Sequence, residues 1–301
     1  MENIPFADTA RPGQFPHRFT QDDRFQYRLK VQPVAGQLEF SIRPVDTRLS
    51  ALAAERVWQG FPASRNFVAP HTDSEDNLRR ARLRAKGKVK LLAMEMRVDR
   101  LFTFTIRHTG KLMPYEDVLT AWDFFRRMAR RADKHFHYVA TPERQGNGQW
   151  HIHAGVSGFQ NVGNFTRMWQ SALNRVLGRS QHLVHGPDSP GLCKLPSKTR
   201  PRRDQNGRAK AIAKYIGKYI GKSLEAGFNR KKYFHTPGIE ITPAQRQWLA
   251  ADGRNAAVLE ALGLYGLLGP EGFPVVEIKF WNRDAHSAWF TVSADSVPPP
   301  F

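Results

Sequence analysis

The chain has 301 residues and one cysteine, and its 46 Lys and Arg residues outnumber its 27 Asp and Glu, which gives a net charge of +19 at pH 7. A single cysteine excludes a disulfide framework and a cysteine-based zinc site. So large a positive excess favours a polyanionic partner, because cations that neutralise phosphates release counterions. We therefore expect a nucleic-acid-binding protein, and a basic factor without catalytic activity fits the same charge.

The first residues lack a basic region followed by an apolar core, so we expect no signal peptide. The longest apolar stretch, Val258–Leu268, is shorter than the roughly 20 residues that span a bilayer. We expect a soluble, intracellular protein that makes no membrane contact.

The first predicted element is a β-hairpin within an N-terminal extension that covers residues 1–73. Apolar and polar residues alternate over Phe25–Val31 and again over Leu38–Ile42. Val34, Ala35 and Gly36 lie between these runs, which is typical of a hairpin turn.

A basic helix is predicted from Ser74 to Arg97. Acidic residues at positions 75 and 76 suit the positive end of a helix dipole. A run of charge is usually a solvated face, but this run is almost purely basic, so we favour contact with phosphates. The candidate DNA-binding residues here are Arg79, Arg80, Arg82 and Arg84.

Six elements then follow in the order β-α-β-β-α-β. The hydrophobic periodicity predicts strands at 101–106, 136–141, 150–156 and 181–185, and helices at 115–131 and 165–177. This order is that of the split βαβ or ferredoxin-like arrangement, an antiparallel sheet with helices on one face. We therefore predict an α+β protein with its core domain at residues 74–238.

Two histidines stand one residue apart on the third of these strands. Because strand residues i and i+2 point to the same face, His151 and His153 lie side by side. Divalent cations usually take an oxygen ligand as well. If Gln145 pairs with Gln149 around the preceding turn, Glu143 lies opposite His151, with Cβ atoms about 5 Å apart. The sequence therefore predicts a site for Mg²⁺ or Mn²⁺ formed by these two histidines and Glu143.

The alternative interpretation is a polar strand face, which is the commoner meaning of an isolated His-x-His. Other histidines make weaker candidates. His182 and His185 lack a nearby carboxylate, and His135 and His137 lie at the start of a strand.

A basic loop over 194–210 leads into a predicted helix at 211–224. The helix places Tyr215 and Tyr219 on one face, and lysines recur every fourth residue beside them, at Lys214, Lys218 and Lys222. A phenol becomes a useful nucleophile when nearby positive charge stabilises its phenolate. The loop contributes further candidate DNA-binding residues, Lys198, Arg200, Arg202 and Arg203.

Taken alone, this pattern also fits an amphipathic surface helix with half-buried tyrosines. Gly221, Lys222 and Ser223 imitate the end of a phosphate-binding loop. That loop requires a glycine where Ile216 stands, so we expect no nucleotide cofactor. Residues 239–301 are predicted to form a C-terminal extension with a helix near 243–262 and a hairpin of 275–281 with 289–292.

Three segments, in order along the chain, together resemble the HUH endonuclease superfamily, named for His, a hydrophobic residue and His. They are Phe102–Thr105, Glu143–His153 and Tyr215–Tyr219, and the resemblance extends over Ser74–Gly238. Within the superfamily the chain looks most like rolling-circle replication initiators of the two-tyrosine type, found among phage and bacterial replication-associated proteins.

The resemblance implies a metal-dependent nick in single-stranded DNA at a replication origin, through a 5′-phosphotyrosine. One tyrosine would make the first nick, for which we favour Tyr215, and the other would attack the regenerated site. Lys218 would orient the phosphate. The expected partners are single-stranded or hairpin origin DNA and a host helicase and polymerase, in the cytoplasm of a bacterial host.

Two rival functions remain at this point. A transposase of the same superfamily typically carries one tyrosine, whereas two are present here. A non-catalytic DNA- or RNA-binding protein would expose stacking aromatic residues on the sheet face, where this sequence places His151 and His153.

Overall fold

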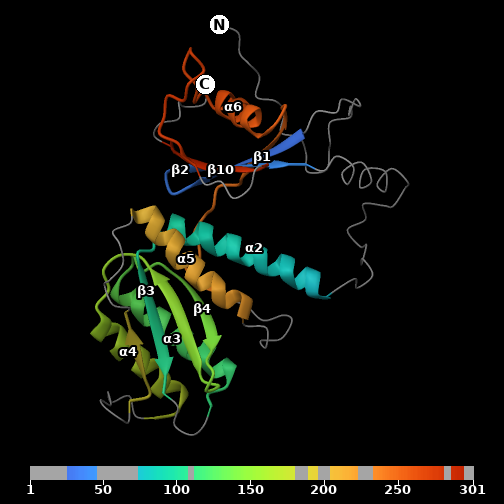
Figure 1. Ribbon diagram of the computed structural model, residues 1–301. Coiled ribbons are helices and arrows are strands. Elements are labelled where there is room, and N and C mark those ends of the chain that lie inside the picture. The colour runs from blue at the N-terminus through green and yellow to red at the C-terminus, as the bar shows by residue number, and fades with distance from the viewer. Residues whose placement is uncertain are drawn as a thin grey trace. The chain divides into compact units, whose positions relative to one another are not determined.

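The computed structural model describes residues 26–45, 74–107, 112–179, 189–195, 204–222, 233–280 and 286–294, and Figure 1 shows the helices and strands that they form. The chain divides into two compact units. One contains Met1–Val31, Glu39–Phe61 and Gln245–Phe301, and the other contains Gln32–Leu38 and Pro62–Ala244. None of the described helices is both long enough and apolar enough to cross a bilayer.

The first unit is built on a five-stranded sheet with the strand order β8-β1-β2-β10-β9. The predicted N-terminal hairpin is confirmed, since Ala35 and Gly36 have φ angles of 50° and 72°, as tight hairpin turns require. Strands from the two ends of the chain share this sheet. Their bounds are β1 Gln26–Val34, β2 Gln37–Pro44, β8 Gln245–Ala250, β9 Lys279–Phe280 and β10 Ala288–Ser293.

The helix predicted near 243–262 is wrong over its first half. Gln245–Ala250 forms β8 and pairs antiparallel with β1, and the helix, α6, runs over Arg254–Leu264. Pairing with a distant strand decides the conformation here, and local periodicity does not reveal such pairing. The C-terminal hairpin is confirmed with a shorter first strand, because β9 pairs antiparallel with β10.

The second unit contains the predicted β-α-β-β-α-β order, and the α+β fold class is confirmed. Its sheet has the order β6-β3-β5-β4-β7, and each printed strand pair is antiparallel. The first four strands thus follow the order fourth, first, third, second of the ferredoxin-like arrangement, and β7 extends the edge. The bounds are β3 Arg100–Ile106, α3 Tyr115–Ala132, β4 Tyr138–Arg144, β5 Trp150–Val156, α4 Val162–Val176, β6 Gly191–Lys194 and β7 Phe234–His235.

Helices cover both faces of this sheet, whereas the sequence predicted one covered face. On one face α3 and α4 bury an aromatic core that includes Phe104, Trp122 and Phe125. On the other face the helices are α2, Ser74–Glu95, and α5, Gln205–Lys222, which lie side by side in Figure 1. Their contacts with the sheet include Ile212 and Ile216 of α5 packed with Val139 of β4.

The end of the core domain differs from its prediction in two places. The strand predicted at 181–185 lies outside the described residues, and the fourth strand of the order is β6. The tyrosine helix begins at Gln205, inside the predicted loop, because Asp204 Oδ1 accepts a hydrogen bond from Gly207 N (2.6 Å) and caps the helix.

Candidate active site

The hairpin between β4 and β5 places the predicted acid opposite the first histidine. Gln145 N donates to Gln149 O (2.9 Å), and Glu143 pairs with His151 across the ladder. Gly148 in the turn has φ of 81°, a conformation that glycine adopts without steric cost. The predicted register is therefore confirmed.

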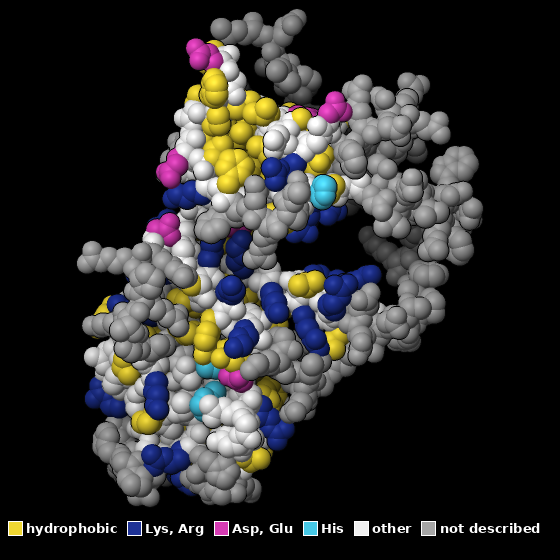
Figure 2. Space-filling view, viewed as in Figure 1, with side chains coloured by type: hydrophobic (Ala, Val, Ile, Leu, Met, Phe, Trp, Pro, Cys, Tyr) yellow, Lys and Arg dark blue, Asp and Glu magenta, His cyan; other side chains and the backbone are white. Residues whose placement is uncertain are grey.

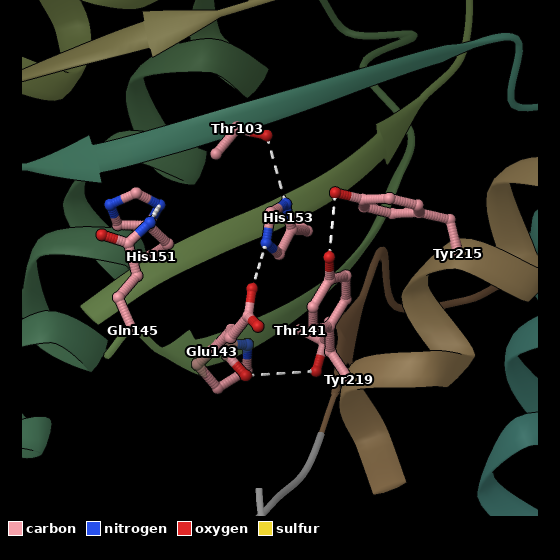
Figure 3. Close-up of polar contacts among 9 residues, drawn as sticks. Thr103, Thr141, Glu143, Gln145, His151, His153, Tyr215 and Tyr219 are labelled. Atoms are coloured by element: carbon pink, nitrogen blue, oxygen red, sulfur yellow. Dashed lines mark hydrogen bonds and ion pairs between the residues drawn. The ribbon is translucent and has the colours of Figure 1, made fainter. Parts of the chain in front are cut away.

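His153 is held between two polar side chains on the sheet face that α5 covers. Its Nε2 lies 2.7 Å from Glu143 Oε2 and its Nδ1 lies 3.1 Å from Thr103 Oγ1, as Figure 3 shows. Burial lowers the pKa of His153, although the hydrogen bond to Glu143 opposes this effect. The imidazole is thus neutral near pH 7, the form that binds metal ions.

His151 has a separate partner. The Gln145 side-chain amide donates to His151 Nδ1 (2.7 Å), and in Figure 3 the ring lies against Gln145, apart from the His153–Glu143 pair. Burial, together with the positive charges of His153 and Lys194, lowers the pKa of His151 to about 4. This imidazole is also neutral near pH 7.

Glu143 and His153 converge, but the His151 ring, held by Gln145, does not join them. Accordingly, across the part of the chain that the structure describes, no three His, Cys, Asp or Glu side chains converge as a metal site. The donor types do fit a divalent cation, because two neutral imidazoles and a carboxylate share one sheet face. Each imidazole also has a polar partner at Nδ1, as metal-binding histidines usually do. The metal centre stays a prediction.

The two tyrosines of α5 both contact His153. The Tyr219 ring stacks on the imidazole with centroids 4.5 Å apart and an interplanar angle of 16°, and the Tyr215 ring meets it edge-on at 5.4 Å and 82°. Tyr219 Oη donates a hydrogen bond to Tyr215 Oη (3.0 Å), as Figure 3 shows. The fold thus brings together the histidine strand and the tyrosine helix, which are about sixty residues apart in the sequence.

The environments of the two phenols differ although their local sequences are identical. Residues 215–222 read Tyr-Ile-Gly-Lys twice. Four residues turn an α-helix by about 400°, so the second copy is rotated by about 40° relative to the first. Tyr215 is half-buried, whereas Tyr219 is turned toward the sheet and is 8% exposed. Burial raises the pKa of Tyr219, and the hydrogen bond to Tyr215 and the charge of Glu143 raise it further.

Gly155 of β5 allows α5 to lie close enough for these contacts. It is on the same strand face as His153, two residues further along. A Cβ atom at this position would lie 2.7 Å from Ile212 Cγ2, 3.3 Å from Ile216 Cδ1 and 3.4 Å from Val98 Cγ2. The sheet therefore needs a residue without a side chain where the tyrosine helix crosses it.

We expect Gly155→Ala to lower the free energy of unfolding by about 1–3 kcal/mol, because an added methyl group overpacks this contact. It should also reduce any DNA-cleaving activity at temperatures where the protein stays folded, since α5 must move away from His153. Urea unfolding and rate measurements on the same preparation check both effects. Adding Ile212→Ala, which removes the clashing methyl group, should restore part of the activity, and wild-type behaviour of Gly155→Ala alone would show that the contact is not tight.

The predicted DNA-binding residues divide into three groups. Those on α2 are described, with Arg79, Arg80 and Arg84 exposed and Arg82 half-buried. On α5, Lys214 and Lys218 are exposed, and Lys222 is the last residue of the helix, with its side chain outside the described part. Lys198, Arg200, Arg202 and Arg203 lie outside the described residues.

Positive charge nevertheless gathers beside the site. In the second unit, Figure 2 shows Lys and Arg side chains over α2 and α5, with histidine and acidic side chains exposed next to them. Gly217 helps to hold the two helices together, because its position faces the Lys86 side chain of α2. The basic surface and the tyrosines therefore share one side of this unit.

Sequence reasoning did not identify Thr103 and Gln145, which hold the two imidazoles. A signal for Thr103 exists in the alternation of β3, where Thr103 and Thr105 interrupt apolar residues and so mark the polar face of that strand. Gln145 entered the prediction only as a residue of the turn. Its contact with His151 depends on side-chain direction, which the pairing register alone does not give.

Residues 99–224 match the family model of replication-associated proteins named for ORF2 and the gene 2 protein. The matched segment runs from the residue before β3 to just past α5, so it includes the histidine strand and the tyrosine helix. This match supports a protein of the replication-initiator type. No curated protein and no solved structure matches the chain.

Proposed function

We propose that this protein is a metal-dependent endonuclease and strand transferase that nicks single-stranded DNA through a 5′-phosphotyrosine and thereby starts rolling-circle replication. The observation that carries the proposal is the contact of both tyrosine rings with His153, which itself pairs with Glu143. The family match over this same segment supports the role in replication.

In the proposed first step, Tyr215 Oη attacks the scissile phosphorus. A bond forms between the phenolic oxygen and phosphorus, and the bond from phosphorus to the 3′ oxygen breaks. The proton that the phenol loses is balanced by the proton that the leaving 3′ oxygen gains. The products are a 5′-phosphotyrosine and a free 3′-hydroxyl, which can prime synthesis.

Tyr219 assists this step in the proposal by donating its hydrogen bond to the attacking oxygen. A hydrogen bond donated to a phenolate is stronger than one donated to a phenol, so this contact stabilises the nucleophile as its proton leaves. After a round of copying, Tyr219 would attack the regenerated junction. Exposed Lys218 would neutralise a phosphate beside the tyrosines.

Glu143, His153 and His151 would hold the divalent cation, Mg²⁺ or Mn²⁺. His151 would have to turn from its present partner, Gln145, to take part. When bound, such an ion supplies Lewis-acid polarisation of a phosphate oxygen. Thr103 keeps the His153 ring in place from the Nδ1 side.

The proposed substrate is single-stranded or hairpin origin DNA, since a nucleotide in a paired duplex does not present its backbone to so enclosed a pair of phenols. The basic residues of α2 and α5 would hold the strand as an electrostatic track. A helicase and a polymerase of a bacterial host, in its cytoplasm, would complete the replication cycle.

The test uses random-sequence single-stranded oligonucleotides, because the origin is to be found by the experiment itself. The protein is incubated with the pool and Mn²⁺, denatured, and washed, and DNA that stays attached is sequenced. The proposal predicts an adduct that survives denaturation, requires the metal and begins at one recurrent sequence. Absence of any adduct, together with reversible binding, would instead indicate a binding protein without catalytic activity.

A further inference from the structure

The edge strand β6 carries two exposed side chains on the same sheet face as the histidines. Leu192 and Lys194 are exposed, while Gly191 and Cys193 between and before them are buried. Cys193 belongs to the aromatic core on the α3 and α4 side, so its neighbours in the strand point to the opposite face. That face is the one that contains His151 and His153.

The pairing register places Lys194 beside the active site. Lys194 pairs with Thr103 of β3, Thr103 pairs with His153 of β5, and Thr103 Oγ1 contacts the His153 ring. Neighbouring strands are about 4.8 Å apart, so Lys194 lies two strand spacings, roughly 10 Å, from His153 at the backbone. A lysine side chain covers much of that distance.

Electrostatics gives a second indication that Lys194 faces this site. Its positive charge contributes, after burial and His153, to the lowered pKa of His151. The charge therefore acts on the surface above the histidines.

The backbone under Lys194 is firmly held. Thr105 Oγ1 donates to Leu192 O (3.1 Å) and accepts from Leu192 N (3.2 Å). A Cβ atom at Gly191 would lie 2.2 Å from Thr105 O, so β6 packs more closely on β3 than any other residue would allow. The position of the lysine backbone is thus fixed by the sheet.

This part of the face lies beside the tyrosine helix. The strands with which α5 makes its main contacts are β4 and β5, and Leu192 of β6 is 38% exposed. A DNA strand that reaches the tyrosines has to cross an adjacent surface, and here that surface offers a cation and an apolar side chain. A phosphodiester and a sugar or base match those two groups.

We infer that Lys194 and Leu192 form a subsite for the nucleotide next to the scissile phosphate, in which Lys194 binds a backbone phosphate of single-stranded DNA and Leu192 contacts the attached sugar or base. This inference rests on the proposed nicking function, which it extends by a strand-positioning residue on β6.

The test measures binding and reaction separately. Binding is measured with the captured DNA sequence and the full chain carrying Tyr215→Phe and Tyr219→Phe, so that no adduct forms. Lys194→Gln should weaken binding by on the order of fivefold, as expected for one charged contact. It should also reduce the slope of log affinity against log salt by about 0.7, the value for one single-strand phosphate.

Lys134→Gln, which removes an exposed lysine between α3 and β4, is the matched control and should change neither quantity. Single methylphosphonates, which lack the phosphate charge, then locate the contact. At one position near the cleavage site the effects of the methylphosphonate and of Lys194→Gln should fail to add.

The reaction arm keeps the tyrosines. With saturating DNA, Lys194→Gln should form the adduct in wild-type yield, because it positions the strand and does not attack it. If the wild-type protein forms an adduct but Lys194→Gln matches the Lys134→Gln control in affinity and salt slope, the subsite is wrong. If the wild-type protein forms no adduct, the nicking function itself has failed.

Discussion

Tyr215→Phe is expected to lower the rate of the first nick at least a hundredfold, because it removes the proposed nucleophile. Tyr215 is the more exposed of the two phenols, and its oxygen accepts the hydrogen bond that Tyr219 donates. Tyr219 is nearly buried and stacked on His153. Rates of adduct formation on the captured sequence measure the difference.

Tyr219→Phe is the matched change, with the same atom removed one helical turn away. It should slow the first nick only about tenfold, the effect of losing one hydrogen bond to the attacking oxygen. It should instead impair the second transfer, in which a bound strand is joined to a new 3′ end. Equal losses in the two variants, or a greater loss in Tyr219→Phe, would contradict this division of roles.

The second large effect is expected at the His153–Glu143 pair. His153→Ala should reduce adduct formation at least about a hundredfold, since it removes a proposed metal ligand and the ring on which both tyrosines pack. Glu143→Gln keeps the shape of the side chain but removes its charge, so it should weaken metal binding with little effect on folding. Calorimetric titration with Mn²⁺ measures the affinity in each variant.

His135→Ala serves as the control for loss of an imidazole, because His135 is exposed outside the site. It should leave both activity and Mn²⁺ affinity unchanged. If the His151→Ala/His153→Ala double variant cleaved DNA with unaltered metal dependence, the histidines would not hold the metal.

The β4–β5 hairpin could be predicted from the sequence because its geometry follows from short-range rules. Strand residues alternate between faces, and a tight turn fixes which residues pair, so Glu143 and His151 could be placed opposite each other. The direction of the His151 ring could not be predicted. It depends on a hydrogen bond to Gln145, and several side-chain rotamers are compatible with the same register.

The position of the tyrosine helix was beyond the sequence for a different reason. Its approach to the sheet depends on the complementarity of Gly155 with Ile212, Ile216 and Val98, which come from three separate segments. The order of the motifs along the chain suggested that histidines and tyrosines meet. The stacking of Tyr219 on His153, and so the inequality of the two phenols, required the packed structure.

Strand β8 shows the same limit. Four of its six side chains are those of Gln, Arg, Gln and Trp, and most of them are exposed, so no alternating apolar face announces a strand. Pairing with β1 across more than two hundred residues decides its conformation. Local patterns therefore predict elements that carry their own hydrophobic face and miss those that a partner strand determines.

The most direct test of the account is to locate the bond between protein and DNA. After reaction and nuclease trimming, the protein is cut after acidic residues, because trypsin would release the two tyrosines in tetrapeptides of identical sequence. Fragmentation of the peptide that runs from residue 205 to 225 then shows which residue carries a nucleotide through its 5′ phosphate. The account predicts that this residue is Tyr215 in the wild-type protein after the first nick. A nucleotide attached outside α5, or the same adduct in the Tyr215→Phe/Tyr219→Phe variant, would contradict it.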